Sequence, residues 1–367
     1  MISTLLFWFF VAATAVQLLI WTGLFARLAF FRMPPHQPEA TQPPVSVIIC
    51  ARNEADNLSK NLCHFLNQNY RSFEIIVVND YSTDQTRQVV LDFSAKYPNL
   101  RLIENQTVSS GKKAALATGI AAAQFDWIVL SDADCRPATP HWIATMQQAL
   151  HDDFQIALGY SPYVRQKGIL NAFIRFETAY TALQYLSFAL AGLPYMGVGR
   201  NLVYHKSLYY QAGGFRKHAH IASGDDDLFV NAIASKSNTT IVLNINAFVY
   251  SQPKERWKSY YYQKARHLTT AKHYRRIHRW MLGALAASHA GHYAAGVLLL
   301  VMGHMPFTVL FTCLVRMVVV IWIYHRVLPR LQATDLVKWV PLLDVCYVFF
   351  YLVFAPALLI GRKNQWK

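Results

Sequence analysis

Short apolar runs recur along the first half of the chain, separated by polar stretches of helical pattern. They cover residues 45–50, 73–78, 100–103 and 127–130. Each run has the length of a buried β-strand, and helix-capping residues follow the first two of them. Regular alternation of strands and helices predicts an α/β domain with a parallel sheet whose two faces are covered by helices.

Much longer apolar runs lie at the two ends of the chain. Residues 2–31 are almost uniformly apolar, and three further runs at 281–303, 306–324 and 341–360 are each long enough to cross a bilayer. Five prolines between residues 33 and 44 indicate an extended linker. These boundaries predict a membrane anchor (1–31), a linker (32–44), a soluble domain (45–280) and a C-terminal transmembrane region of about three helices (281–367).

One apolar stretch inside the soluble domain, residues 169–193, is interrupted by Thr178, Thr181 and Gln184. These polar side chains favour a buried helix, or one that lies on the membrane surface, over a further span. Arg316 and Asp344 fall within predicted spans, so we expect them to face protein or each other.

Charge indicates how the chain is oriented. Its 367 residues are 54% hydrophobic and carry a net charge of +15, and basic residues follow the first span. The positive-inside rule therefore predicts a multi-pass protein of the cell membrane, such as a bacterial inner membrane, with its soluble domain in the cytoplasm. With four spans the basic tail at 362–367 would lie outside, which the same rule disfavours. No nucleic-acid-binding motif is present, and the five cysteines lack the spacing of a zinc site or a disulfide framework.

Acidic residues follow three of the predicted strands. Asp132 and Asp134 are one residue apart and share a face, which is costly for two carboxylates unless a cation lies between them. Oxygen ligands of this kind suit Mg²⁺ or Mn²⁺ bound together with a substrate phosphate. Glu54 and Asp80 follow two other strands. Each acidic residue alone could be a helix cap, but their joint position at the carboxyl edge of a sheet predicts a nucleotide and metal site.

The segments 45–54, 77–84 and 131–134, with Gly111 and Lys112, resemble the nucleotide-binding half of inverting family 2 glycosyltransferases. The resemblance covers roughly residues 45–270. It implies the GT-A fold, a Rossmann-like mixed sheet covered by helices, and a UDP-sugar donor. It also implies that Glu54 and Asp80 contact the uridine, that Lys112 lies near the donor, and that Asp132 and Asp134 hold the sugar and the metal.

A second acidic cluster, Asp225 to Asp227, resembles the Glu-Asp base motif of this family. Transfer without a covalent intermediate needs a carboxylate that takes the proton of the acceptor hydroxyl. Asp226 is the predicted base and Asp225 the reserve, because a third aspartate leaves the register open by one residue.

Two further segments resemble parts of the family's active site. Gln263, Arg266 and His267 resemble the Gln-x-x-Arg-Trp motif of processive and lipid-linked members, with His267 in place of Trp. The resemblance implies that they bind the donor diphosphate and the acceptor end. The same residues would also suit a basic helix at the membrane surface. Asn201, after a glycine-rich turn, is expected to line the active site.

The combined prediction is a membrane-bound glycosyltransferase that moves a sugar from a UDP-sugar to a lipid, such as a polyprenyl phosphate, a diacylglycerol or a sphingoid lipid. A polysaccharide-synthesising transferase, a nucleotidyltransferase and a binding protein with a degenerate nucleotide fold are the alternatives. The sequence leaves open the sugar, the acceptor, single or repeated transfer, and the oligomeric state.

Overall fold

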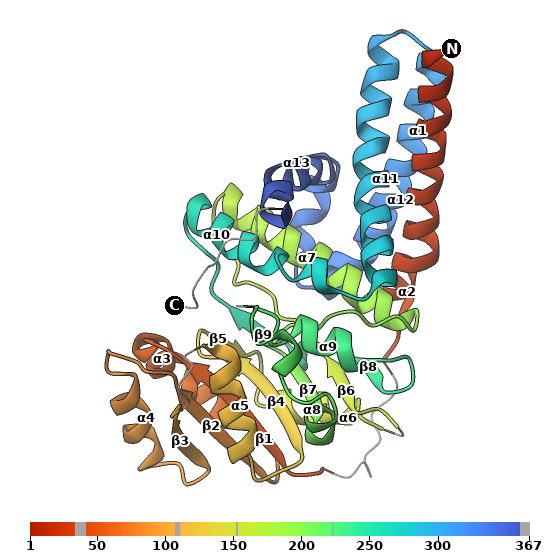
Figure 1. The fold of residues 1–367 in the computed structure, drawn as a ribbon. Coiled ribbons are helices and arrows are strands. Elements are labelled where there is room, and N and C mark those ends of the chain that lie inside the picture. Colours follow the sequence, from red (N-terminus) through yellow and green to blue (C-terminus); the bar gives the residue numbers. More distant parts are fainter. Residues whose placement is uncertain (34–41, 107–110, 152, 222, 360–367) are drawn as a thin grey trace.

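A computed structural model describes residues 1–33, 42–106, 111–151, 153–221 and 223–359. It contains an α/β domain, from which long helices rise side by side (Figure 1). Most of the predicted linker and all of the basic tail at 362–367 lie outside the described residues.

Seven strands form the main sheet of the domain, in the order β3-β2-β1-β4-β7-β6-β8. The strands are β1 (Val45–Ala51), β2 (Phe73–Asn79), β3 (Leu100–Glu104), β4 (Trp127–Asp132), β6 (Ile156–Leu158), β7 (Leu202–His205) and β8 (Thr239–Ile241). A separate pair joins β5 (Cys135–Pro137) to β9 (Val249–Ser251). The first four strands are parallel, as predicted, whereas β7 runs antiparallel to both β4 and β6. The sheet is therefore mixed, which confirms the predicted fold class.

Helices cover both faces of the sheet, and the strands are apolar on both sides for that reason. The α/β helices are α3 (Ala55–Leu66), α4 (Thr86–Ser94), α5 (Lys112–Ala122), α6 (Trp142–Gln148), α8 (Lys206–Gln211) and α9 (Asp227–Ile233). In β1, Val47 and Ile49 belong to one hydrophobic cluster while Ile48 and Cys50 belong to the other. Each buried aliphatic side chain contributes roughly 1.5–3 kcal/mol to stability. This two-sided core fixes the sheet, so its carboxyl edge can hold a site rigidly.

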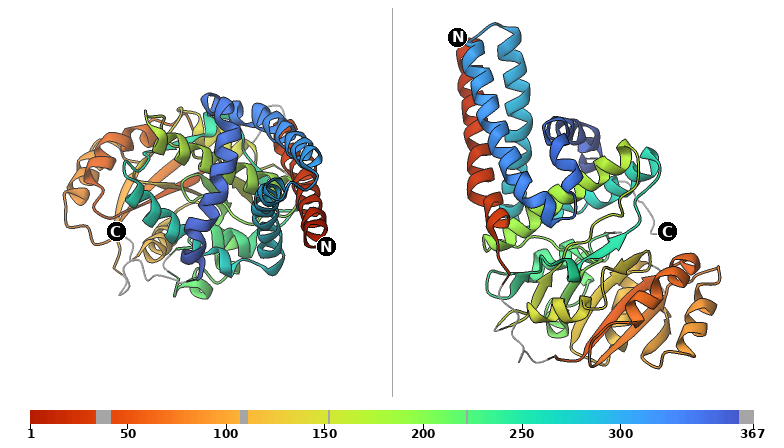
Figure 2. Two further views of the ribbon diagram at one scale, coloured as in Figure 1. Left: turned by 90° about the horizontal axis from the view of Figure 1, so that it is seen from above. Right: turned by 180° about the vertical axis from the view of Figure 1, so that it is seen from behind.

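Within the residues that the structure describes, four helical segments are long and apolar enough to cross a membrane: 2–30, 276–301, 306–330 and 334–356. They contain α1 (Ile2–Leu19) with its continuation α2 (Ala26–Phe30), then α11 (Arg276–Val301), α12 (Pro306–Arg330) and α13 (Val340–Leu359). The segments α1, α11 and α12 stand upright together, whereas α13 runs across their direction in both views (Figures 1 and 2). The segment that contains α13 has the length and composition of a span, but it is not parallel to the other three. Length and composition do not determine how a helix is oriented.

Two more helices lie between this bundle and the sheet. They are α7 (Ile169–Leu190) and α10 (Trp257–Leu268). Many side chains of α7, including those of Tyr180 and Leu183, are buried, which agrees with the prediction of a buried helix.

A buried ion pair holds α13 in its crosswise position. The guanidinium of Arg316 on α12 pairs with the carboxylate of Asp344 on α13, and both side chains are almost fully buried. The Tyr293 hydroxyl of α11 also donates to Asp344 at 2.6 Å, and Arg316 donates to the Gln17 side chain of α1 at 2.9 Å. The prediction was that Arg316 and Asp344 face protein or each other, and the structure pairs them with each other. These contacts join all four helices.

Candidate active site

A cavity of about 1770 Å³ opens between the carboxyl edge of the sheet and the helices α7, α10, α11 and α13. Nine of the eleven predicted site residues line it: Glu54, Lys112, Asp132, Asp134, Asp225, Asp226, Gln263, Arg266 and His267. Cavities for one small ligand are typically about 300–1,000 Å³, so this one has room for two substrates. Residues separated by more than 200 positions in the chain thus meet in one space.

Lys112 joins the two acidic clusters. Its ammonium, at the start of α5, lies 2.8 Å from a carboxylate oxygen of Asp132 and 3.1 Å from one of Asp225. Although burial opposes the effect, the charges of Asp132 and Asp225 raise the pKa of Lys112 well above its usual value. Lys112 therefore remains a cation and neutralises part of both clusters.

The end of β4 suits a divalent cation. One carboxylate oxygen each from Asp132 and Asp134, and the Cys135 sulfur, lie within 4.8 Å of one another. Burial and the negative charge of Asp132 raise the pKa of Asp134, and burial raises the pKa of the Cys135 thiol well above its usual value. The thiol therefore stays protonated, and the pair of carboxylates supplies the oxygen ligands that Mg²⁺ or Mn²⁺ prefers.

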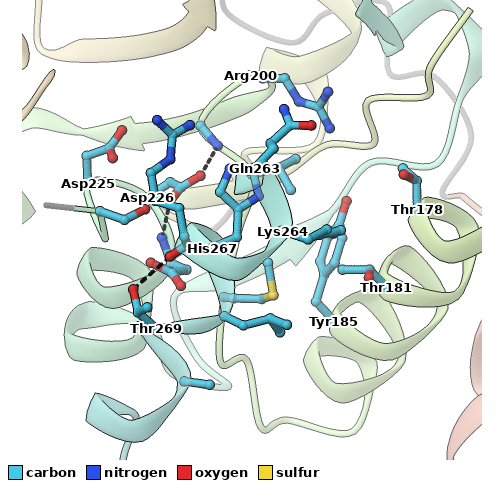
Figure 3. A pocket seen from close by; sticks show the side chains of 18 of the residues that line it. Thr178, Thr181, Tyr185, Arg200, Asp225, Asp226, Gln263, Lys264, His267 and Thr269 are labelled. Carbon is cyan, nitrogen blue, oxygen red and sulfur yellow. Dashed lines mark hydrogen bonds between the residues drawn. The ribbon is translucent and has the colours of Figure 1, made fainter. Parts of the chain in front are cut away.

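Asp226 is oriented toward the cavity by two backbone amides (Figure 3). Gly199 donates to one oxygen and Asp227 to the other, both at 2.7 Å. Gly199 permits this approach, because a Cβ there would lie 3.2 Å from the Asp226 side chain. Burial, and then the charges of Asp225 and Asp227, raise the pKa of Asp226 to about 7. A carboxylate with this pKa is suited to accept a proton near neutral pH.

The neighbours of Asp226 have other contacts. Asp225 is paired with Lys112, and Asp227 accepts hydrogen bonds from the hydroxyls of Thr270 and Tyr274. Asp227 therefore attaches the start of α9 to the segment that follows α10. The sequence did not decide which of these neighbouring aspartates is the base. These contacts favour Asp226, because Asp225 and Asp227 are engaged elsewhere.

One face of α10 presents the residues of the predicted diphosphate motif. Arg266 and His267 follow Gln263 by three and four positions, so they share a helix face with it, and all three line the cavity. Lys264, beside them, pairs with Glu177 of α7 at 2.7 Å.

Asp80 is buried and does not line the cavity itself. Its carboxylate accepts hydrogen bonds from the Asn105 side chain and, at 3.0 Å, from the Gly111 backbone amide. It thereby fixes the residue that precedes Lys112. Asn53 and Tyr81 follow β1 and β2 in left-handed conformations, both with φ of 54°. Such strained residues gather at functional sites, and here they flank the predicted nucleotide end.

Asn201 is placed differently from its prediction. Its side chain is fully buried, where its oxygen accepts from the Trp142 indole at 2.9 Å and its nitrogen donates to the carbonyls of Tyr160 and Ala247. The preceding residue, Arg200, lines the cavity instead and packs its guanidinium on the Tyr163 ring at 4.7 Å. Arg200 and Asn201 are adjacent in the turn before β7, where the Asn201 amide donates to the Val198 carbonyl, so the basic residue next to the predicted Asn201 is the site residue that the sequence reasoning missed.

We expect Asn201→Ala to destabilise the fold without weakening donor binding in the folded protein. The change leaves three buried polar groups without partners, which costs ~3 kcal/mol, or about 6–12 °C in melting temperature for a domain of this size. Thermal denaturation in detergent, beside the exposed control Asn69→Ala, measures the effect. Unchanged melting together with lost donor binding would return Asn201 to the role predicted from sequence.

Residues 46–211 match the family model described as "Glycosyl transferase family 2". Among curated proteins, the chain is 28% identical over 246 residues to the probable glycosyltransferase YdaM of Bacillus subtilis, covering 61% of this chain and 54% of that protein. It is 38% identical over 98 residues to the dolichyl-phosphate beta-glucosyltransferase ALG5A of Trichomonas vaginalis, covering 24% and 30%. The chain thus spans about half, or less, of the length of these relatives.

Among solved structures, the mannosyltransferase PcManGT from Pyrobaculum calidifontis, in complex with GDP-Man and Mn²⁺, is similar in fold. The TM-score is 0.60 and the identity 18%, and the match covers 95% of this chain and 99% of that one. The similarity extends over both the α/β domain and the long helices, because nearly the whole chain is aligned.

Proposed function

We propose that the chain, whose residues 46–211 match the glycosyl transferase family 2 model and whose fold is of the GT-A type, is a membrane-bound inverting glycosyltransferase that moves a sugar from a nucleoside diphosphate sugar to a lipid. The main support for this proposal is the position of Lys112. Its ammonium lies between Asp132, one of the two carboxylates that suit a metal ion, and Asp225, which adjoins the proposed base. A transferase needs both groups in one cavity, whereas a nucleotide-binding protein needs only the first.

The donor is proposed to bind at the carboxyl ends of β1, β2 and β4. Glu54 and Asp80 mark the nucleoside end, and the resemblance in their segments favours uridine. Lys112, Arg200 and Arg266 lie around Asp132 and Asp134, where they would contact the diphosphate. A divalent ion held by these two carboxylates would neutralise diphosphate charge.

In the proposed mechanism, Asp226 accepts the proton of an acceptor hydroxyl. The oxygen forms a bond to the anomeric carbon of the sugar as the bond from that carbon to the diphosphate oxygen breaks. Arg200 and Arg266 stabilise the negative charge that develops on the diphosphate. Attack from the face opposite the leaving group inverts the anomeric centre, and no covalent intermediate forms on the protein.

The chain is proposed to cross the membrane with α1, α11 and α12, while α13 lies within one leaflet. The helix α2, the start of α11 and the end of α12 lie at the end of this bundle that faces the α/β domain (Figure 1). These segments and the residues next to them carry Arg27, Arg32, Arg275, Arg276, Arg279, Arg326 and Arg330. The turn between α11 and α12 at the other end, residues 302–305, has no lysine or arginine. The positive-inside rule then places the α/β domain in the cytoplasm. After crossing with α1, α11 and α12 the chain is on the cytoplasmic side again, so α13 also lies on that side.

Nucleoside diphosphate release tests the function. Purified full-length chain in nanodiscs with a bacterial lipid extract and Mn²⁺ is given UDP-glucose, UDP-galactose, UDP-N-acetylglucosamine or GDP-mannose, each with labelled sugar. We expect one UDP-sugar to give both release and label in the organic phase. Label in water-soluble glycan would favour a polysaccharide-synthesising transferase. Binding of a nucleotide without release from any donor would favour a degenerate binding protein.

A further inference from the structure

The cavity continues beyond the acidic clusters into a side chamber between α7, α11 and α13. Thr178, Thr181 and Gln184 of α7 form one wall, and Gly283 and Ala286 of α11 with Phe354 of α13 form the other. The α7 residues are the polar positions that interrupt its apolar sequence. In Figure 3, Thr178 and Thr181 point toward Lys264 and the active site. The side chamber is therefore amphipathic: polar toward the active site and apolar toward the bundle.

The polar wall of the side chamber has little net charge. Thr178, Thr181 and Gln184 are neutral. Glu177 of α7, next to Thr178 in the chain, pairs with Lys264 at 2.7 Å and accepts a hydrogen bond from Thr181 at 2.9 Å. This wall suits hydroxyl groups, which both donate and accept hydrogen bonds.

The apolar wall opens at the surface of the bundle. Gly283 and Ala355 line the cavity and are also exposed. A Cβ on Gly283 would meet nothing within 4 Å. Gly283 lies seven residues after the start of α11, roughly 10 Å along the helix from its basic first turn. This opening therefore lies at the depth of lipid chains in the proposed membrane orientation.

The reacting end of the cavity disfavours an anionic acceptor. Asp225, Asp226 and Asp227 lie together at the proposed point of attack, where the ammonium of Lys112 is engaged with Asp225 and Asp132. Arg200 and Arg266 also line the cavity, but they are proposed to bind the donor diphosphate. A phosphate monoester placed at Asp226 would be repelled by these carboxylates, and a nucleophile that is already an anion would need no base.

On the basis of the proposed function, we infer that the acceptor is a membrane lipid with an uncharged, hydroxyl-bearing head group, and that it enters sideways between α11 and α13. Its head group lies along the polar wall of α7 and presents a hydroxyl to Asp226. Its hydrocarbon chain passes Gly283 and Phe354 into the bilayer. The donor arrives from water at the sheet edge, so the two substrates enter from different phases.

The test compares Gly283→Phe with Ala284→Phe. The two positions are adjacent on α11 and both exposed, but only residue 283 lines the cavity. Replacing a helical glycine by phenylalanine does not lower helix propensity, so loss of folding is not the expected cause of any defect. Full-length variants in vesicles of phosphatidylcholine and phosphatidylglycerol receive the active nucleotide sugar and either diacylglycerol, monoglucosyldiacylglycerol or a polyprenyl phosphate. Transfer to lipid and binding of the nucleoside diphosphate with Mn²⁺ are measured in parallel.

We expect the wild type to use a hydroxyl lipid in preference to polyprenyl phosphate. Gly283→Phe should lower this transfer about 10²-fold, as expected when a substrate is displaced by an ångström or more, with nucleotide binding unchanged. Ala284→Phe should transfer normally. Preference for polyprenyl phosphate, or equal transfer by Gly283→Phe and the wild type, would overturn the inference while leaving a transferase. Absence of both nucleotide binding and release in the wild type would instead refute the proposed function.

Discussion

Asp226→Asn is expected to lower kcat for transfer by about 10³-fold, because it removes the proposed base, whose typical contribution is 10²–10⁴-fold. An amide has nearly the same shape as a carboxylate, and its one oxygen can keep the Gly199 hydrogen bond while the Asp227 hydrogen bond is lost. The groups proposed to bind the donor are unchanged, so the affinity for the donor should stay the same. Single-turnover rates and nucleotide titrations separate the two quantities.

The pH profile provides the signature of this base. Asp226 acts only when deprotonated, and its pKa is raised to about 7. The rate should therefore rise about ten-fold per pH unit below 7 and level off above it. Asp225→Asn should move the inflection to lower pH, because the charge of Asp225 contributes to the raised pKa. A full rate with the same pH rise in Asp226→Asn would assign the base to Asp225 or Asp227.

Asp134→Asn is expected to weaken Mn²⁺-dependent donor binding by about 10²-fold or more, since even indirect metal contacts are worth 10–100-fold. Chelation of metal in the wild type should have a similar effect. Isothermal titration with nucleoside diphosphate, with and without Mn²⁺, measures it.

Asp126→Asn is the matched control for Asp134→Asn. Asp126 is exposed and lies just before the opposite end of the same strand, β4. It should bind metal and donor like the wild type. Donor binding by Asp134→Asn that still responds fully to Mn²⁺ would remove this residue from the metal site.

The local sequence pattern was sufficient to predict the half of the site that lies at the ends of the parallel strands. The strands β1, β2 and β4 are continuous apolar runs, and residues that follow parallel strands must meet at one edge of the sheet. The amino-acid sequence alone therefore places Glu54, Asp132 and Asp134 together. The pairing of β7 antiparallel to β4 and β6 depends on contacts between distant segments, which strand length and hydrophobicity do not encode.

Two other features could not be predicted, because composition does not determine the direction of a side chain or of a helix. Arg200 and Asn201 are neighbours in one turn, and only the direction of the chain into β7 decides which of them faces the cavity. For α13, its length and apolar sequence suit a span, but the partners of Asp344 on α11 and α12 hold it crosswise.

The contacts of Asp344 also show what a chain that ends early would lose. Gln17 lies in the first helix and Asp344 in the last one described, with Arg316 between them in the network. A chain that stopped before Asp344 would leave the buried Arg316 without its carboxylate partner, and an unpaired buried charge costs ~3–5 kcal/mol. Because α13 also supplies Phe354 to the cavity wall, an unfinished chain is both less stable and unable to enclose its substrates.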